Sequence, residues 1–383
     1  MKTYFIHTFG CQSNKSDSER IAGDYEARGY QPAKSWENTT ELVVNTCAIR
    51  KSAEDRARAF VLKVVKHYQA KNLPKPKIIF TGCMLHHGHN KILEMIPNID
   101  EILPVNEVGF NQAAVRRDKK HAWIPISAGC NSFCTYCIVP YSRGREQSRS
   151  MDEIIKEVEN LVAKGYSEIT LLGQNVNSWG LEKMGIGLRK MLMSDQEFTR
   201  EMIPSNQSQY LKPQGTPPFV QLLREISKFP EIKIIRFLSS NPWDFHDELI
   251  EEIITNKKID RYVHLPVQSG SNSVLERMNR GYTTQDYAKI TNKLLKGDPS
   301  IVLGTDIIVG FPGETDEEFA ETVEFAKKMN WQVGFVAMYS PRPGTAAYKL
   351  YQEEIPYKVR KQRWEILDKI INKDNLKTRP KVV

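Results

Sequence analysis

Three cysteines in one short stretch carry the clearest chemical signal in this sequence. Cys130, Cys134 and Cys137 have the spacing Cys-x3-Cys-x2-Cys, between a short apolar segment (122–126) and a helix predicted to begin near Met151. Cysteine thiolates are the standard ligands of iron–sulfur clusters, so three of them on one loop can bind three irons of a 4Fe–4S cube. A cube normally takes four cysteines, and no fourth cysteine lies nearby. The fourth iron is then open to another ligand.

An open iron beside a reducible cluster is what reductive cleavage of S-adenosylmethionine (SAM) needs, and the spacing resembles the signature of the radical SAM enzymes. A zinc site and a disulfide framework are the alternatives. A zinc site would need a fourth ligand, and the nearest histidine, His121, precedes the apolar segment rather than lying on the loop. A disulfide framework fits poorly with a long chain that shows no export signal.

The remaining three cysteines lie in the first third of the chain at equal intervals. Each of Cys11, Cys47 and Cys83 is 36 residues from the next. Each follows an apolar segment that predicts a strand, at 3–8, 41–45 and 77–81. The carboxyl ends of parallel strands form the ligand crevice of an open α/β sheet, so the three thiols are expected to converge there.

Two features bear on this second cysteine set. Gly10 and Gly82 precede Cys11 and Cys83, and glycine lets the backbone turn close to a bulky group. The alternative is three buried structural cysteines, because free cysteine is often a core residue.

Helices are predicted between the strands of this first segment, at 17–28, 52–68 and 89–95. The alternation predicts a small parallel α/β domain over residues 1–119. The run His86-His-Gly-His89 within it is interpreted as surface rather than as a metal site.

Residues 120–372 continue the alternation through six further βα units. Strands are predicted at 123–127, 168–172, 232–239, 262–266, 301–309 and 333–338. Helices are predicted at 151–164, 220–228, 247–256, 284–295, 316–329 and 358–372. Six units suit a partial (β/α)6 barrel, whose substrate face would be the carboxyl ends of its strands.

Bulk composition sets further limits. The chain has 383 residues, 40% of them hydrophobic, and a formal net charge of +8. The length allows two or three domains, and the charge favours a polyanionic partner such as nucleic acid. No apolar run approaches the roughly 18 residues of a membrane span, and the N-terminus has no apolar region of signal length. We therefore expect a cytoplasmic protein with no membrane partner.

With their local sequences, the two cysteine sets resemble the methylthiotransferases, a family of radical SAM enzymes. The motifs are Thr-Phe-Gly-Cys11-Gln-Ser-Asn, Asn-Thr-Cys47-Ala-Ile-Arg, Thr-Gly-Cys83-Met and Cys134-Thr-Tyr-Cys137-Ile-Val-Pro-Tyr-Ser-Arg-Gly-Arg-Glu. The resemblance covers essentially the whole chain. It implies two 4Fe–4S clusters, an auxiliary one on Cys11, Cys47 and Cys83 and a SAM-cleaving one on Cys130, Cys134 and Cys137. It also implies a radical SAM core after an N-terminal methylthiotransferase domain, and two SAM molecules per transfer of a methylthio group to a C–H bond.

By the same resemblance, short polar turns after the barrel strands contact SAM. Gly173, Gln174 and Asn175 follow the second predicted strand, and Gln268 follows the fourth. An ordinary turn is the alternative for Gly173, Gln174 and Asn175. Arg143, Arg145 and Arg149, after the cysteine loop, can bind phosphate or form a solvated basic turn.

Two segments depart from the βα alternation. Residues 181–218 are polar and are predicted to form an insertion on the substrate side, either a lid or a plain loop. Residues 373–383 are expected to be a stub where the family's C-terminal RNA-binding β-barrel would start.

Within the family, Leu-Leu-Gly-Gln-Asn-Val-Asn-Ser-Trp179 is similar to the enzymes that act on N6-isopentenyladenosine of tRNA. The resemblance implies methylthiolation of C2 of that base, next to the anticodon. Its partners would be a tRNA anticodon stem-loop and a reductant protein such as flavodoxin or ferredoxin, and the chain would be a monomer. Two alternatives stay open: methylthio transfer to threonylcarbamoyladenosine tRNA or a ribosomal-protein aspartate, and a non-enzymatic iron–sulfur RNA-binding protein.

Overall fold

The computed structural model describes residues 2–48, 51–109, 113–184, 215–329, 331–352 and 354–372. The chain divides into two compact units. The first unit contains Met1–Lys119 and Tyr141–Gly144, and the second contains Lys120–Pro140 and Arg145–Val383. Residues 185–214 of the predicted 181–218 insertion and the whole 373–383 stub lie outside the described residues.

The first unit is built on a parallel sheet of five strands in the order β2-β1-β3-β4-β5. The strands are β1 (Thr3–Thr8), β2 (Gln31–Pro32), β3 (Glu41–Thr46), β4 (Lys77–Gly82) and β5 (Glu101–Ile102). β3 and β4 are buried along almost their whole length, as expected for strands covered on both faces. The predicted parallel α/β domain is confirmed.

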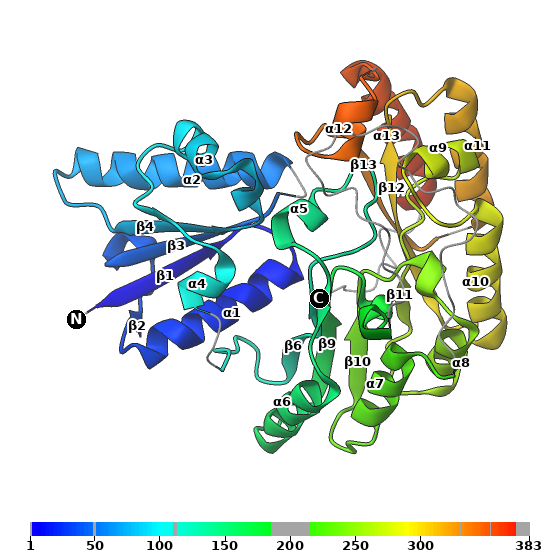
Figure 1. Cartoon of the computed structure of the whole chain (residues 1–383), viewed down its shortest axis with the longest axis horizontal. Helices are drawn as coiled ribbons and strands as arrows, with labels where there is room; N and C mark the ends of the chain where they lie inside the picture. The colour runs from blue at the N-terminus through cyan, green and yellow to red at the C-terminus, as the bar shows by residue number, and fades with distance from the viewer. Residues whose placement is uncertain are drawn as a thin grey trace. The chain divides into compact units, whose positions relative to one another are not determined.

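Helices cover both faces of this sheet (Figure 1). α1 (Gln12–Ala27) and α4 (Val105–Gly109) pack together, and Ile21 and Tyr25 of α1 share a core with Tyr4 and Val43 of the strands. α2 (Lys51–Ala70) and α3 (His89–Met95) lie on the other face.

α1 begins five residues earlier than predicted. Its first turn, Gln-Ser-Asn-Lys-Ser, has no apolar periodicity, so the sequence pattern starts only at Asp17. Cys11 and Asn14 form a capping box. The Cys11 side chain accepts from the backbone amide of Asn14, the Asn14 side chain accepts from the backbone amide of Cys11, and the helix therefore begins at Gln12.

The second unit contains six parallel βα strands. They form two three-stranded sheets, β10-β9-β6 and β11-β12-β13, joined by a parallel bridge between Ile235 and Ile259. Their bounds are β6 (His121–Pro125), β9 (Glu168–Leu172), β10 (Ile234–Phe237), β11 (Tyr262–His264), β12 (Val302–Val309) and β13 (Val333–Met338). The predicted partial barrel is confirmed. β10 and β11 are shorter than the strands predicted at 232–239 and 262–266.

Helices alternate with these strands and share their core, as Figure 1 shows. They are α6 (Met151–Ala163), α7 (Pro218–Ser227), α8 (Asp247–Thr255), α10 (Thr284–Gly297), α11 (Asp316–Met329) and α13 (Tyr357–Asn372). Short elements that the sequence pattern did not predict are α5 (Val139–Arg143), α9 (Asn272–Arg277), α12 (Ala346–Leu350) and the antiparallel pair β7 (Ser127–Ala128) and β8 (Gln147–Ser148). Among the described residues, no helix is both long and apolar enough to span a membrane.

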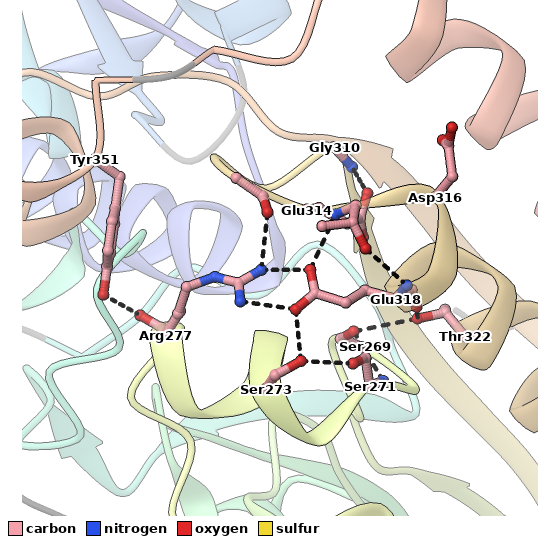
Figure 2. A network of polar contacts seen from close by, with 12 residues as sticks. Ser269, Ser271, Ser273, Arg277, Gly310, Glu314, Asp316, Glu318, Thr322 and Tyr351 are labelled. Atoms are coloured by element: carbon pink, nitrogen blue, oxygen red, sulfur yellow. Dashed lines mark hydrogen bonds and ion pairs between the residues drawn. The ribbon is translucent and has the colours of Figure 1, made fainter.

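A network of polar contacts ties the loops after β11 and β12 to the starts of two helices (Figure 2). Arg277 of α9 forms a two-pronged ion pair with Glu318 of α11, at 2.8 and 2.6 Å. Glu318 also accepts a hydrogen bond from Ser273, and Glu314 accepts the backbone amide of Gly310. The network fixes the loops that lead out of the barrel strands.

One ion pair of this region is almost completely buried. Arg363 of α13 donates to Glu314 at 2.6 Å, and the two side chains are 6% and 1% exposed. Burial is the largest influence on Glu314 and raises the pKa of its carboxyl despite the nearby guanidinium. The pair is therefore costly to bury and more costly to break.

We expect Arg363→Met to lower the free energy of unfolding by about 3–5 kcal/mol, because it leaves the Glu314 carboxylate buried without its cation. Urea unfolding followed by intrinsic fluorescence measures this change. The matched control is Lys361→Met on the same helix, whose partner Glu365 lies at 3.8 Å with both side chains more than half exposed. The control should cost less than about 1 kcal/mol. Equal losses in the two variants would contradict the prediction.

Candidate functional site

Strand register brings the N-terminal cysteines to one edge of the first sheet. Thr46, the last residue of β3, pairs with Gly82, the last residue of β4, so Cys47 and Cys83 leave neighbouring strands at the same level. A Cβ atom on Gly10 would lie 2.9 Å from the Cβ of Cys47, so the turn before Cys11 passes directly against Cys47. The three cysteines therefore gather at the carboxyl edge, as their spacing predicted.

Buried amides fix the loops that carry two of these cysteines. The Asn14 side-chain oxygen accepts from the backbone amide of Cys11 at 3.3 Å, and its NH2 group donates to Thr46 O and to Asn45. Asn45 donates in turn to Asn14 O and to Ser18. Sequence reasoning did not single out either asparagine. Asn45 could have been found as a polar residue at the end of an apolar strand, because a buried amide needs partners.

Both the backbone conformation and the neighbouring atoms at position 82 require a glycine. Its φ is +97°, and a Cβ atom would lie 2.3 Å from the carbonyl oxygen of Thr46 and 2.6 Å from its nitrogen. The contacts are backbone atoms of the neighbouring strand, which cannot move without breaking the ladder.

We expect Gly82→Ala to displace Cys83 and to lower iron content from about eight to about four per chain, the difference of one cube. The control is Gly29→Ala, whose φ is +82° but whose Cβ would meet nothing within 4 Å. It carries the same conformational cost of about 1–2 kcal/mol. Iron analysis after anaerobic reconstitution compares the two, and full iron in Gly82→Ala would contradict the prediction.

The interpretation of His86 and His87 as surface residues is wrong. Both are only partly exposed, whereas His89 is exposed. His86 Nδ1 lies 2.8 Å from the carbonyl oxygen of Cys83, and His87 lies 3.4 Å from the buried carboxylate of Glu54. These contacts hold the 3-10 turn η2 (Cys83–His87) in place, so the histidines support the loop of Cys83.

Arg143 binds a cysteine of the first unit rather than solvent. Its Nε donates to Cys83 Sγ at 3.2 Å, and its Nη2 donates to Asp17 at 2.8 Å. Burial by itself lowers the pKa of Arg143. The charges of Asp17 and of the cysteines outweigh this effect, so the pKa lies well above its ordinary value. Arg149 is also paired, with Pro125 O and Glu157, whereas Arg145 is exposed.

The Cys130–Cys137 loop is held by backbone contacts to the segment after α9. Thr135 donates its amide to Met278 O at 3.0 Å and its hydroxyl to Arg277 O at 2.8 Å. Asn279 donates to Phe133 O at 3.0 Å. Phe133 and Asn279 both have positive φ, 45° and 55°, a strained conformation for non-glycine residues that the mutual contact maintains.

The sulfur atoms of this loop lie in a buried environment. Cys130 and Cys134 are buried and Cys137 is partly exposed. Burial raises the pKa of the Cys130 thiol well above its ordinary value, and Glu146 adds to the shift. A thiolate there needs a cation, and bound iron would supply one. Arg280, which is 3% exposed, donates to Cys134 Sγ at 3.1 Å.

The cysteine donor set can be compared with that of a single metal ion. Three ligands of one zinc ion lie close together, because each Zn–S bond is about 2.3 Å long. Within the described ranges, the only His, Cys, Asp and Glu side chains whose ligand atoms all lie within 4.8 Å of one another are Glu54, His86 and His87. Neither cysteine triad is that compact. Two sets of three free thiols are instead the donor set that two cubes with one open iron each would take.

The predicted SAM-contact turn at Gly173–Asn175 is connected to the cysteine loop through neighbouring hydrogen bonds. A Cβ atom on Gly173 would lie 2.6 Å from Ser127 Oγ, so this turn passes against β7. Beyond it, Asn177 exchanges hydrogen bonds with Asn241, whose side chain donates to Ser132 of the loop.

The individual residues of these turns differ in exposure. Asn175 is 2% exposed and donates to Asp244 at 3.1 Å, whereas Gln174 is partly exposed. Gln268 has a φ of 71°, and its backbone pairs with Asp306 and Ile308 of β12. That strained backbone is typical of functional positions. A SAM contact by Gly173, Gln174, Asn175 or Gln268 stays a prediction.

Glu146 is a buried acid near the cysteine loop that sequence reasoning did not single out. It is 6% exposed, accepts from the Ser178 hydroxyl, and its backbone amide donates to Asn131, the neighbour of Cys130. Burial raises its pKa to about 8, so its carboxyl is mostly protonated at neutral pH. Its place in the Arg-Gly-Arg-Glu run was the only available signal.

Two family models match the chain in separate segments. The Radical SAM superfamily matches residues 124–326, and the family described as "Uncharacterized protein family UPF0004" matches residues 3–104. A protein of Thermotoga petrophila named tRNA-2-methylthio-N(6)-dimethylallyladenosine synthase is 36% identical over 98% of this chain and 82% of its own length. Proteins of the same name from Dictyoglomus thermophilum and Bacillus pumilus are each 37% identical over 98% of the chain, and 85% and 73% of their own lengths.

The chain belongs to the radical SAM methylthiotransferase family. It is therefore an enzyme whose cofactors are SAM and 4Fe–4S clusters. The family membership predicted from the cysteine motifs is confirmed.

Solved structures confirm the fold of this methylthiotransferase at a greater distance. The radical SAM methyltransferase TsrM of Kitasatospora setae, solved with cobalamin and a [4Fe-4S] cluster, matches with a TM-score of 0.57. It is 13% identical and covers 91% of this chain and 77% of its own. The cobalamin-dependent radical enzyme OxsB matches with a TM-score of 0.53 at 10% identity, over 99% of this chain and 56% of its own.

Proposed function

We propose that this methylthiotransferase adds a methylthio group to C2 of N6-isopentenyladenosine, the base next to the anticodon of tRNA. The observation that supports the proposal most is the near full-length similarity to three proteins named tRNA-2-methylthio-N(6)-dimethylallyladenosine synthase. The formal net charge of +8 agrees with a nucleic-acid substrate. An anticodon loop is single-stranded, so its base can be splayed out of the stack into a protein site.

Each cysteine triad is assigned one cluster under this proposal. Cys130, Cys134 and Cys137 would hold the cube that binds SAM, and Cys11, Cys47 and Cys83 would hold the auxiliary cube. When bound, these groups supply reductive SAM cleavage and a site for the transferred sulfur. The chain supplies ligands and burial: the buried cysteines Cys47, Cys83, Cys130 and Cys134 keep the sulfur chemistry away from water.

The substrate is tested by offering the reconstituted, reduced enzyme three acceptors in parallel. These are an anticodon stem-loop with N6-isopentenyladenosine, the same stem-loop with threonylcarbamoyladenosine, and the ribosomal protein whose aspartate is the alternative target. Mass spectrometry should detect the added methylthio group in the first acceptor only, and both 5′-deoxyadenosine and S-adenosylhomocysteine should form.

Different results would contradict the proposal in different ways. Modification of the second or third acceptor would replace the substrate and keep the chemistry. The absence of 5′-deoxyadenosine from fully loaded, reduced protein would instead favour an iron–sulfur RNA-binding protein without activity.

A further inference from the structure

Each cysteine triad has an arginine that donates a hydrogen bond to one of its sulfur atoms. In the first unit, Arg143 Nε lies 3.2 Å from Cys83 Sγ. In the second unit, Arg280 Nη1 lies 3.1 Å from Cys134 Sγ. The Arg143 side chain is 17% exposed, and Arg280 is 3% exposed. Burying a guanidinium is costly unless it has partners, so two such contacts at the two triads require an explanation.

The two arginines differ in what surrounds their charge. Arg143 is paired with the carboxylate of Asp17 at 2.8 Å, which offsets part of its positive charge. Arg280 contacts the Tyr282 hydroxyl, the carbonyl oxygen of Pro266 and the face of Trp243 at 4.6 Å. Among the described residues, the groups found against its guanidinium are Tyr282, Pro266, Trp243 and Cys134, and none of them is a carboxylate. No carboxylate in this set offsets its charge at Cys134.

A fixed positive charge acts unequally on the two redox states of a cluster. A cube held by three thiolates is negative, and it gains one further negative charge when it is reduced. In a buried site the attraction of a guanidinium for that extra charge is poorly screened. Hydrogen bonds to the cysteine sulfurs act in the same direction, because they also stabilise the more negative state.

We propose that Arg143 and Arg280 are positioning residues that raise the reduction potentials of the auxiliary and SAM clusters, each through its own N–H···S contact. The inference rests on the assignment of one cluster to each triad in the proposed function. It also predicts an order: the SAM cluster depends on Arg280 more strongly than the auxiliary cluster depends on Arg143, because Asp17 offsets only the second arginine.

The test separates the clusters by using the full chain with one triad removed at a time. The Cys130/Cys134/Cys137→Ala background leaves the auxiliary cluster, and the Cys11/Cys47/Cys83→Ala background leaves the SAM cluster. Arg143→Met and Arg280→Met are then made in both backgrounds, so each variant is the matched control of the other. Midpoint potentials are measured by redox titration with electron paramagnetic resonance, which needs no turnover.

In the first background, Arg143→Met should lower the equilibrium constant for one-electron reduction several-fold, and Arg280→Met should leave it unchanged. In the second background, Arg280→Met should lower it by at least about tenfold, equivalent to 59 mV for one electron, and Arg143→Met should leave it unchanged. Arg143→Lys and Arg280→Lys keep the charge and should recover part of each loss. Asp17→Asn removes the offsetting charge and should raise the potential of the auxiliary cluster.

Three results would overturn the inference. The first is an unchanged potential in both Met variants with intact clusters. The second is an equal shift of both potentials by one variant, which would indicate a general structural change. The third concerns a Met variant that does not bind its cluster. The Lys variants and Asp17→Asn then provide the test, and unchanged midpoint potentials in these variants would contradict the inference. Iron content of the unmodified protein is read first, since about four irons instead of about eight would overturn the proposed function as well.

Discussion

The Cys11/Cys47/Cys83→Ala variant is expected to retain about four of about eight irons per chain and to lose methylthio transfer completely, while it still cleaves SAM. The three cysteines meet at the carboxyl edge of the first sheet, and the loop of Cys130, Cys134 and Cys137 belongs to the second unit, which has its own core. Iron and sulfide analysis after anaerobic reconstitution measures the loss, and 5′-deoxyadenosine formation measures the remaining activity.

The unmodified protein, reconstituted in parallel, is the control for this variant. About four irons in both proteins would show that the N-terminal triad is structural. The chain would then be a one-cluster radical enzyme, and sulfur insertion would have to be abandoned as its reaction.

The Cys130/Cys134/Cys137→Ala variant is expected to reduce 5′-deoxyadenosine formation to the level of SAM without protein. These cysteines lie on the one loop that provides three thiols within eight residues, and an absent cluster cannot be replaced by any side chain. Methylthio transfer should be lost as well, although about four irons should remain on the N-terminal triad. Chromatography of the quenched reaction measures the nucleoside.

The matched control is Ser132→Ala on the same loop. Ser132 contacts Cys130 Sγ through its backbone amide at 3.4 Å, which the substitution leaves intact, whereas the hydroxyl that accepts a hydrogen bond from Asn241 at 3.3 Å is removed. We expect it to keep its full iron content and most of its SAM cleavage. Continued 5′-deoxyadenosine formation by the triple variant would remove the cysteine loop from the reaction.

The sequence alone determined the fold class and the chemistry. β1, β9 and β13 have the bounds that their apolar runs predicted. β9 is buried along almost its whole length, and such a buried parallel strand is recognisable as a continuous apolar segment. The Cys-x3-Cys-x2-Cys spacing identified the loop, because a short loop leaves little freedom for where its thiols can lie. The equal spacing of Cys11, Cys47 and Cys83 indicated their position at strand ends for a related reason, since each βα repeat has a similar length.

Only the tertiary structure decided which polar groups support these cysteines. Arg143 meets an aspartate 126 residues away, and Arg280 meets a cysteine 146 residues away, so no local pattern could pair them. The same local sequence is compatible with an arginine on a solvated turn and with an arginine buried against a cysteine sulfur. The folded chain distinguishes them, because burying a guanidinium forces it to find a negative or accepting partner. The same reason applies to Asn45 and Glu146. The sequence gives their residue types, but only the packing of the folded chain buries them.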